Sequence, residues 1–321
     1  MSPASAGGDR GCSLVRARWT VALAAVVAAV ALGGCGSQPA SDVERGALRD
    51  DAITVASFDF PESELLAQVY GQALQAAGYN VRFEIGLGPR EFVQPALAHG
   101  LVELVPEYAG SALQFVTLGG SQPTADVDAT SAALERALDE RGLMALAPAA
   151  AQDANAVVVT RTLADRFDLD EIGDLRTVAA DLTFGGPPGC PDRPFCLGGL
   201  GTVYGLEFAR FVPLDVGGPL THQALVRGHV DVALLFTTDP SIAADDLVVL
   251  ADDLALQPAE NVTPVVHRAV VDRWGAPVVD VVDAVSARLT TAGLLALNGR
   301  VVAGDPTPAV AADWLRTEGL A

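Results

Sequence analysis

Lysine is absent from this chain of 321 residues, whose twenty basic residues are all Arg, against forty acidic residues. The net charge of −20 argues against a nucleic-acid partner, because phosphate recognition depends on clustered cations that this sequence lacks. The same imbalance favours small cationic or zwitterionic partners. The lack of Lys, together with an excess of Ala, Val and Gly, indicates a GC-rich genome rather than a function.

The sequence also lacks the short motifs of common enzyme sites. It contains no G-x-S-x-G elbow, no H-E-x-x-H, no P-loop and no G-x-G-x-x-G after a strand, and its four His are scattered. We therefore predict a protein that is not an enzyme and that needs no metal and no cofactor. A secreted hydrolase with an unrecognised Ser and His pair stays open as a distant alternative.

Cysteine is scarce, with four residues in the chain. Cys12 and Cys35 belong to the N-terminal segment, which leaves Cys190 and Cys196 around a five-residue loop. A disulfide is the expected pairing in an oxidising compartment. A metal pair is the rival, although no His or third Cys lies nearby in the sequence. Closing so short a loop contributes about 2 kcal/mol, so the bond is expected to staple a surface excursion.

The apolar run near the N-terminus, residues 21–32, is shorter than the ~20 residues that a membrane-spanning helix needs. Arg16 and Arg18 precede it, and the small residues Gly-Gly before Cys35 complete the pattern of a secretory signal. The tetrapeptide LGGC at residues 32–35 resembles a bacterial lipobox. That resemblance implies that Cys35 is diacylated and holds the mature chain at the extracytoplasmic face of the cell membrane.

From Ile53 onward, short apolar runs alternate with longer amphipathic ones, which is typical of βα units. The pattern predicts strands over residues 53–57 and 81–85. Asp59 and Glu62 have the spacing of a capping box that opens a helix between these strands, and Gly78 ends it.

Two segments of the chain match each other at a constant offset. Residues 96–104 (ALAHGLVEL) align with residues 224–232 (ALVRGHVDV), and the alignment continues to pair Tyr108 with Phe236. Each copy predicts a helix that ends at Gly, a strand with an acidic residue near its start, and a ring at the strand's carboxyl end. Ligands of open α/β sheets collect at that end, so we predict two lobes that share a crevice. The alternative is a chance match of common helix-Gly-strand units.

The tail shows helical patterns near residues 278–302 and 307–318, which we expect to return to the first lobe through a crossing strand at 258–264. The predicted divisions are a lipoprotein signal peptide (1–34), a flexible tether (35–50), lobe I (51–150 plus 258–321) and lobe II (151–257).

Nearly the whole mature chain resembles the glycine betaine/carnitine/choline-binding proteins of osmoprotectant ABC importers. The stretches that carry the resemblance are SFDFPESELL (57–66), GLGPREFVQPAL (86–97), ELVPEYAGSAL (103–113), FGGPPGCPDRPFCLGGL (184–200), VYGLEF (203–208), LDVGGPLTHQAL (214–225), VDVALLFTTDP (230–240) and LQPAENVTPVV (256–266). The resemblance implies an α/β fold, a periplasmic-binding-protein-like (type II) two-lobed clamp in which each lobe is a mixed, mostly parallel sheet flanked by helices. It also implies a quaternary ammonium ligand, an aromatic cleft and delivery to a transmembrane permease.

A quaternary ammonium group donates no hydrogen bond, so ring faces must hold it, at roughly 0.5–2 kcal/mol per ring. The family's PEYTG-like motif falls on residues 106–110 and indicates Tyr108, and its aromatic residue before the TD pair falls on Phe236. Phe60, Tyr204 and Phe184 are further candidates. For each ring, packing in a core is the alternative.

Polar candidates flank these rings. Ser57 and Ser63 offer hydroxyls, and the helix that opens after Asp59 offers backbone N–H groups to a ligand carboxylate. Thr237 and Asp239 follow Phe236, and Asp239 favours a cationic ligand or, alternatively, caps a helix.

The chain departs from the family pattern in two ways, since Ser63 stands where relatives carry Gln and Phe stands at several ring positions. These changes leave open a second ligand class, a more apolar or aromatic small molecule in the same clamp.

Overall fold

The structure is a computed structural model that describes residues 51–321. The predicted signal peptide, the lipidation residue Cys35 and the tether lie outside the described residues. In the described part, no helix combines the length and the apolar composition needed to cross a bilayer.

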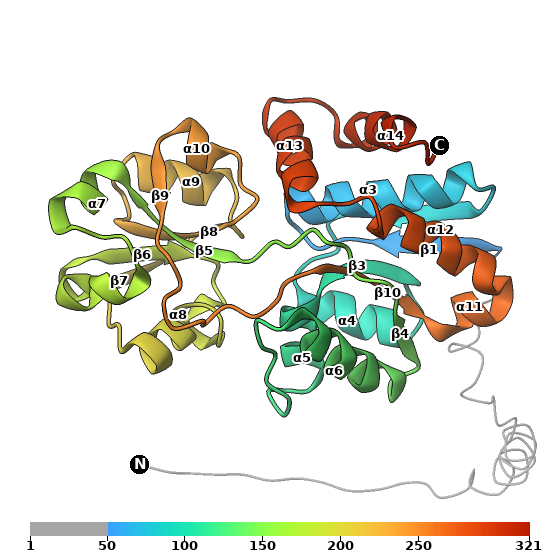
Figure 1. Ribbon diagram of the computed structural model, residues 1–321, viewed down its shortest axis with the longest axis horizontal. Coiled ribbons are helices and arrows are strands. Elements are labelled where there is room, and N and C mark those ends of the chain that lie inside the picture. The colour runs from blue at the N-terminus through green and yellow to red at the C-terminus, as the bar shows by residue number, and fades with distance from the viewer. Residues whose placement is uncertain (1–50) are drawn as a thin grey trace, which may run out of the picture. The chain divides into compact units, whose positions relative to one another are not determined.

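Lobe I is built on a five-stranded sheet with the order β2-β1-β3-β10-β4 (Figure 1). Its strands are β1 (Ala52–Ala56), β2 (Asn80–Glu84), β3 (Leu104–Tyr108), β4 (Leu143–Ala145) and β10 (Val262–His267). The accompanying helices are α3 (Pro61–Ala76), α4 (Arg90–Ala98), α5 (Ala109–Val116), α6 (Val127–Asp139), α11 (Arg268–Trp274), α12 (Ala276–Ser286), α13 (Thr291–Val302) and α14 (Thr307–Thr317). Strand β1 is parallel to β2 and β3, whereas β10 is antiparallel to β3 and β4.

Lobe II repeats this plan with the order β7-β6-β8-β5-β9. Its strands are β5 (Asn155–Thr160), β6 (Thr183–Gly186), β7 (Arg210–Pro213), β8 (Val232–Phe236) and β9 (Leu247–Val249). Its helices are α7 (Arg161–Phe167), α8 (Leu197–Gly199), α9 (Pro219–Val226) and α10 (Ser241–Ala244), with short turns η2 (Ile172–Thr177), η3 (Ala179–Asp181), η4 (Cys190–Asp192) and η5 (Leu200–Tyr204). Strand β6 is parallel to β7 and β8, and β5 is antiparallel to β8 and β9.

The two sheets are therefore mixed and equivalent strand by strand, with one strand in each running against the other four. The predicted α/β class with mixed, mostly parallel sheets is confirmed. The opposing strands, β10 and β5, are the first strands that the chain forms after it crosses between the lobes.

The internal match corresponds to the same local structure in both lobes. Gly100 and Gly228 have φ of 65° and 70°, a left-handed conformation that Gly adopts without strain. After each of them the chain turns back on its helix, because Leu101 N–H donates to Ala96 O and His229 N–H donates to Ala224 O, both at 2.8 Å.

The acidic residues of the match also act alike. Glu103 accepts the backbone N–H of Thr54 at 2.9 Å, and Asp231 accepts that of Thr183 at 2.8 Å. A carboxylate thus joins the start of β3 to β1 in lobe I, and another joins the start of β8 to β6 in lobe II. These contacts fix the position of each strand and of the ring at its carboxyl end.

The predicted helix is α3, which packs its apolar side chains against the sheet, but its first turn is not capped as predicted. Phe60, not Asp59, occupies the N-cap position and no side chain caps the helix, so the expected capping box is wrong. The Glu62 carboxylate turns into the protein interior instead, where it has stronger donors than a backbone N–H.

The tail also corrects the sequence prediction. The pattern near 278–302 forms two helices, α12 and α13, because the chain turns at residues 287–290 and restarts with Thr290 as the N-cap of α13. The expected strand over 258–264 begins at Val262, and residues 258–261 belong to a connecting segment. The pattern at 307–318 forms α14, as predicted.

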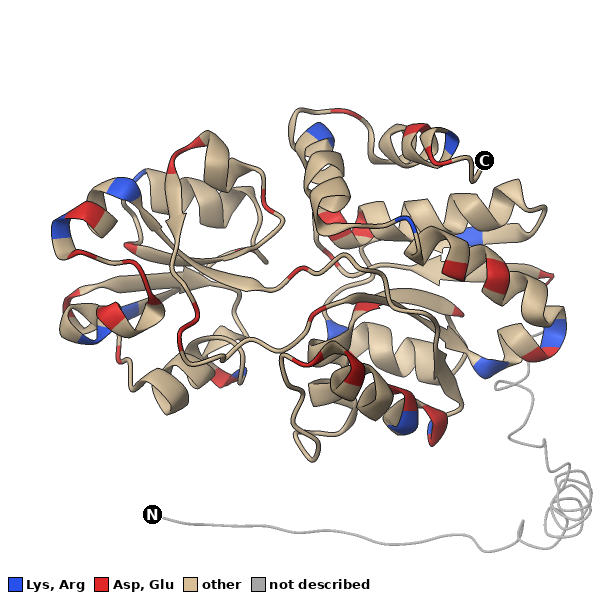
Figure 2. Cartoon of the chain, viewed as in Figure 1, with Lys and Arg blue, Asp and Glu red and all other residues tan. Residues whose placement is uncertain are grey.

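Two connecting segments, residues 146–154 and 250–261, join the lobes and pair with each other. Gln152 and Asn261 form an antiparallel bridge, Asp153 N–H donates to Glu260 O at 3.1 Å, and Val262 N–H donates to Ala151 O at 3.0 Å. Figure 2 shows acidic positions on both segments. The lobe limits at 150/151 and 257/258 remain a proposal.

Candidate functional site

A cavity of about 210 Å³ lies where β3 and β8 end, with walls from both lobes and both connecting segments. Its lining residues are Phe60, Arg90, Glu91, Tyr108, Ser111, Gln114, Phe115, Asp153, Asn155, Pro187, Arg193, Pro194, Phe195, Cys196, Val216, Gly217, Leu234, Phe236 and Glu260. The carboxyl ends of the strands thus meet at one site, as the internal match predicts.

Three predicted rings converge on this cavity. The Phe60 ring centre lies 5.5 Å from that of Phe236 and 6.0 Å from that of Tyr108, and both pairs are tilted, at 34° and 31°. Phe60 also stacks on Phe58 at 5.9 Å, which supports it from behind. Rings in such a cluster present their faces in different directions, which is the arrangement that surrounds a cation.

A second cavity, of about 660 Å³, lies next to the first. The two share Phe60, Phe236, Val216 and Gly217, and the second one continues between α9 and α10 of lobe II and the end of α13 in lobe I. Phe60 and Phe236 therefore form the partition between the cavities.

Tyr108 is held by a buried polar cluster. Its hydroxyl donates to Glu62 at 2.7 Å, and the other Glu62 oxygen accepts from Thr238 at 2.5 Å and from Asn298 at 2.6 Å. Burial raises the pKa of Tyr108 well above its usual value, and the negative charge of Glu62 raises it further, so the phenol keeps its proton. A phenol that donates to a carboxylate has an electron-rich ring, which strengthens its attraction for a cation.

Arg90 lines the cavity but already has an anionic partner. It donates to Glu107 through Nε and through Nη2, the latter at 2.9 Å, and Gln94 donates to the same carboxylate. Glu107 is fully buried, so this pair is shielded from water. The guanidinium also lies over the Phe58 ring, with its central carbon 4.9 Å from the ring centre.

Two more carboxyl groups face the cavity from the connecting segments, and burial raises the pKa of both. The pKa of Asp153 lies well above its usual range, first because of burial and then because of the charge of Glu62. Burial raises the pKa of Glu260 to about 7, although Ser111 donates to it through its hydroxyl and its N–H. Both groups hold protons that an ordinary surface carboxyl would lose.

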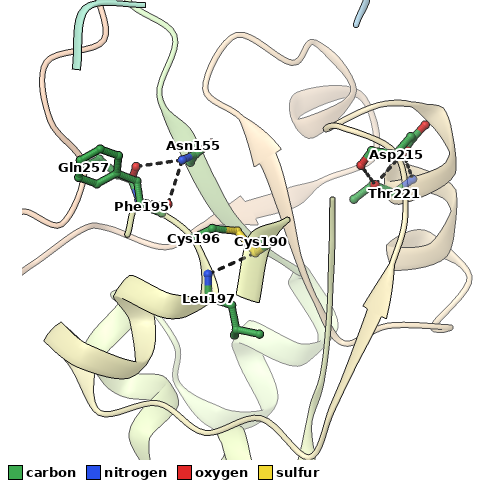
Figure 3. Close-up of a disulfide and its surroundings, with 8 residues drawn as sticks. All are labelled: Asn155, Cys190, Phe195, Cys196, Leu197, Asp215, Thr221 and Gln257. Carbon is green, nitrogen blue, oxygen red and sulfur yellow. Dashed lines mark hydrogen bonds between the residues drawn. A yellow bond between two sulfur atoms is a disulfide. The ribbon is translucent and has the colours of Figure 1, made fainter. Parts of the chain in front are cut away.

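The disulfide between Cys190 and Cys196 is present, as predicted, with the two Cα atoms 5.2 Å apart. The loop that this disulfide closes was expected to be a surface loop, but it also forms part of the cavity wall, since Arg193, Pro194 and Phe195 line the cavity. Figure 3 shows Phe195 beside the disulfide. The Phe195 carbonyl accepts from Asn155 at 2.9 Å and from Gln257 at 3.1 Å.

Two predicted hydroxyls do not face the cavity. Ser57 accepts the N–H of Gly86 at 2.8 Å, and Ser63 accepts the N–H of Phe58 at 2.9 Å. Both are fully buried. They fix the loop that carries Phe60, so they position a ring and do not offer a hydroxyl to the ligand.

Two predicted rings also lie elsewhere. Phe184 is fully buried against Phe208 in the core of lobe II, because its position on the interior strand β6 directs it into the packed face of the sheet. Tyr204 is buried in the same core, where its hydroxyl donates to Asp252 and accepts from Leu254 N–H. For these two residues the alternative, packing in a core, is correct.

The two predicted residues after β8 lie in different surroundings. Thr237 lines neither cavity and bonds to Asp153 and to Ala154 N–H, which ties β8 to a connecting segment. Asp239 lines the second cavity and accepts the N–H of Ser241 at 2.8 Å, but Pro240 occupies the N-cap position of α10 and no side chain caps this helix, so the expected capping role is wrong.

Sequence reasoning missed the carboxylates. Glu62 was assigned to a capping box, and Asp153 and Glu260 lie in connecting segments without periodicity. A signal was nevertheless present for Asp153 and Glu260, because each is the only acidic residue in its pentapeptide, AQDAN and QPAEN. An isolated acid in a crossing segment of a two-lobed protein is a reasonable site candidate.

Comparisons with known proteins show the family of this chain. A family model described as the substrate binding domain of ABC-type glycine betaine transport system matches residues 51–317. A glycine-betaine-binding protein of Pseudomonas aeruginosa is 29% identical over 285 residues, covering 86% of this chain and 90% of the relative. The glycine betaine-binding protein YehZ of Escherichia coli is 25% identical over 277 residues, covering 83% and 90%.

Solved structures resemble the fold as well. One described as a glycine betaine/carnitine/choline ABC transporter has a TM-score of 0.68 at 21% identity, covering 84% of this chain and 99% of the other.

Proposed function

Since the chain belongs to the family of substrate-binding domains of ABC-type glycine betaine transport systems, we propose that it binds a quaternary ammonium solute in the cavity between its lobes and delivers it to a membrane permease. The observation that carries the ligand class is the convergence of Phe60, Tyr108 and Phe236 on one cavity. Such rings attract a cation that cannot donate hydrogen bonds.

Charge supports the same ligand class. Asp153 and Glu260 line the cavity, and Glu62 accepts the hydrogen bond of the Tyr108 hydroxyl. A neutral apolar or aromatic ligand, the second candidate from the sequence, gains no electrostatic attraction from these carboxyls, whereas a cation is attracted to their ionised forms.

Calorimetry of the purified protein against glycine betaine, choline, carnitine and proline betaine tests the proposal. We expect at least one of these to bind with a dissociation constant in the micromolar range or below. Absence of heat from the entire panel, in a sample whose thermal unfolding is cooperative, would overturn the ligand assignment.

The anchor is a separate part of the proposal. Cys35 in the lipobox-like LGGC would hold the protein on the extracytoplasmic face of the membrane, within reach of the permease. Diacyl attachment supplies the two chains that stable anchoring requires. In the producing bacterium, Cys35→Ala is expected to move the protein from the membrane fraction to the soluble one, and an unchanged membrane fraction would contradict the anchor.

A further inference from the structure

The charges around the cavity are unequal once each ion pair is counted. Arg90 is matched by Glu107 at 2.9 Å, and Arg193 is matched by Glu91 at 2.9 Å on the exposed rim. Asp153 and Glu260, 5% and 2% exposed, also lie on the cavity wall, and the cation near Glu260 is Arg90, which Glu107 already pairs. The empty cavity therefore has more carboxyl groups than cationic side chains around it.

The groups that face these two carboxyls come from several elements. Asp153 faces Glu62 of α3 and Tyr108 of β3, and Thr238 N–H donates to it at 3.1 Å. Glu260 faces Arg90 of α4, Glu107 of β3 and Ser111 of α5. Arg90 is the one cation among these neighbours, and it lies against two carboxyls, Glu107 and Glu260.

A ligand carboxylate would meet acidic neighbours in this arrangement. The start of α3, where the sequence suggested an anion site, carries Glu62 and Glu64 in its first turn. Arg90 has its Nε and Nη2 groups directed at Glu107. A zwitterion would add a negative group to a cavity that already holds too many.

A cation, in contrast, can replace a proton. Burial raises the pKa of Asp153 well above its usual range and that of Glu260 to about 7, so in the empty protein Glu260 exchanges its proton with solvent near neutral pH. A positive charge placed between the rings favours their ionised forms and sends the proton to the buffer.

We propose that the cavity selects a quaternary ammonium ion of net positive charge that has no carboxylate, and that this ion releases protons from the separate carboxyl groups of Asp153 and Glu260 on the cavity wall. This inference rests on the proposed function and specifies it. It distinguishes this chain's ligand from zwitterions such as glycine betaine.

The test is calorimetry with choline and with glycine betaine between pH 6 and pH 8.5, in phosphate and in Tris, whose ionisation heats differ. Choline is expected to bind at least about ten-fold more tightly than glycine betaine at pH 8. Its dissociation constant should fall by up to about ten-fold per pH unit between pH 6 and 7, and the two buffers should report about half to one proton released per ligand.

Two neutral variants identify the groups. Asp153→Asn and Glu260→Gln should each weaken choline binding by about ten-fold, leave glycine betaine unchanged or tighter, and reduce the proton release. Glu135→Gln, on the exposed face of α6, is the matched control and should change none of these values.

The outcomes separate the two hypotheses. Tighter binding of glycine betaine than of choline at pH 8, or choline binding without proton release, overturns this inference while the transport function stands. If none of the four solutes of the panel binds, the proposed function fails, and this inference fails with it. If Asp153→Asn and Glu260→Gln bind choline as the unmodified protein does, the assignment to these two carboxyls is wrong.

Discussion

Lobe I and lobe II place a ring at the end of equivalent strands but hold their halves of the cavity by different means. In lobe I, Tyr108 is 6% exposed and donates to Glu62, within a cluster of buried hydrogen bonds. In lobe II, Phe236 has no hydroxyl and packs against Phe60 and the bare backbone of Gly217, and the adjoining wall is a disulfide loop. The same strand-end position thus supports a polar wall in one lobe and an apolar, covalently stapled wall in the other.

The largest expected effect comes from removing the ring of lobe I. Tyr108→Ala deletes one cation-binding face and leaves the buried Glu62 carboxylate without its phenol donor, which together should weaken ligand binding by about 100-fold or more. Phe236→Ala deletes a ring alone and should cost about ten-fold. Calorimetry measures both, with Tyr108→Phe as the variant that keeps the ring. Equal losses in the two Ala variants would show that the polar cluster adds nothing to the lobe I wall.

Glu260, in the connecting segment 250–261, should make the free energy of unfolding depend on pH. Burial raises the pKa of Glu260 from 4.5 to about 7, so the folded protein binds more protons than the unfolded chain between those values. This contribution to stability is therefore largest at low pH and is lost as pH rises towards 7, by about 2 kcal/mol between pH 5 and 7.

Glu260→Gln should flatten that part of the stability curve, as measured by urea unfolding at several pH values. Glu135→Gln is the surface control. A Glu260→Gln variant whose stability falls with pH as steeply as that of the unmodified protein would contradict the assignment.

The Cys190–Cys196 disulfide of lobe II is expected to contribute mainly to stability. Replacing Cys190 and Cys196 together by Ser opens a loop that the disulfide closes, and the free energy of unfolding should fall by about 2 kcal/mol. Ligand affinity should fall only a few-fold, because Asn155 and Gln257 still bind the Phe195 carbonyl. Denaturant unfolding and calorimetry measure the two effects. Treatment of the unmodified protein with a reductant should reproduce both, and an unchanged unfolding midpoint would contradict this role.

The smallest expected effect tests how Phe236 is seated. A Cβ at Gly217 would lie 2.6 Å from the Phe236 ring, so Gly217→Ala should displace the ring and weaken ligand binding by roughly ten-fold or less. Gly228→Ala is a matched control, since its φ of 70° is similarly left-handed but its Cβ would meet nothing within 4 Å. Both variants should lose about 1 kcal/mol of stability, and Gly217→Ala alone should lose affinity. Unequal stability losses with equal affinities would refute the ring contact.

Much of the fold could be predicted from local patterns. The first βα unit, the matched segments at 96–104 and 224–232, and the disulfide all follow from apolar spacing, from Gly at a helix end, or from the closeness of two Cys in the chain. The helix starts were less predictable. Glu62 has the spacing of a capping residue, but a carboxylate goes to whichever donors the tertiary structure brings near it, here those of Tyr108, Thr238 and Asn298.

The predicted rings fall into two groups, those at the cavity and those in a core, and here too the tertiary structure decides. Tyr108, Phe60 and Phe236 are close in space because parallel strands and the loop after β1 end at one edge. Phe184 and Tyr204 have equally suggestive motifs, yet they point into the core of lobe II. A ring's identity and its motif do not reveal which side of a strand or turn faces the ligand.

By itself the sequence determined the α/β fold, the family and the rings that its strand ends carry, because these depend on neighbours within about ten residues or on whole motifs. Only the tertiary structure decided the charge of the cavity. Glu62, Asp153 and Glu260 are far apart in the chain. Asp153 and Glu260 reach one cavity because the two connecting segments pair with each other, and Glu62 of α3 acts on Asp153 through its charge. Their protonation depends on burial, which arises only once both lobes have folded around them.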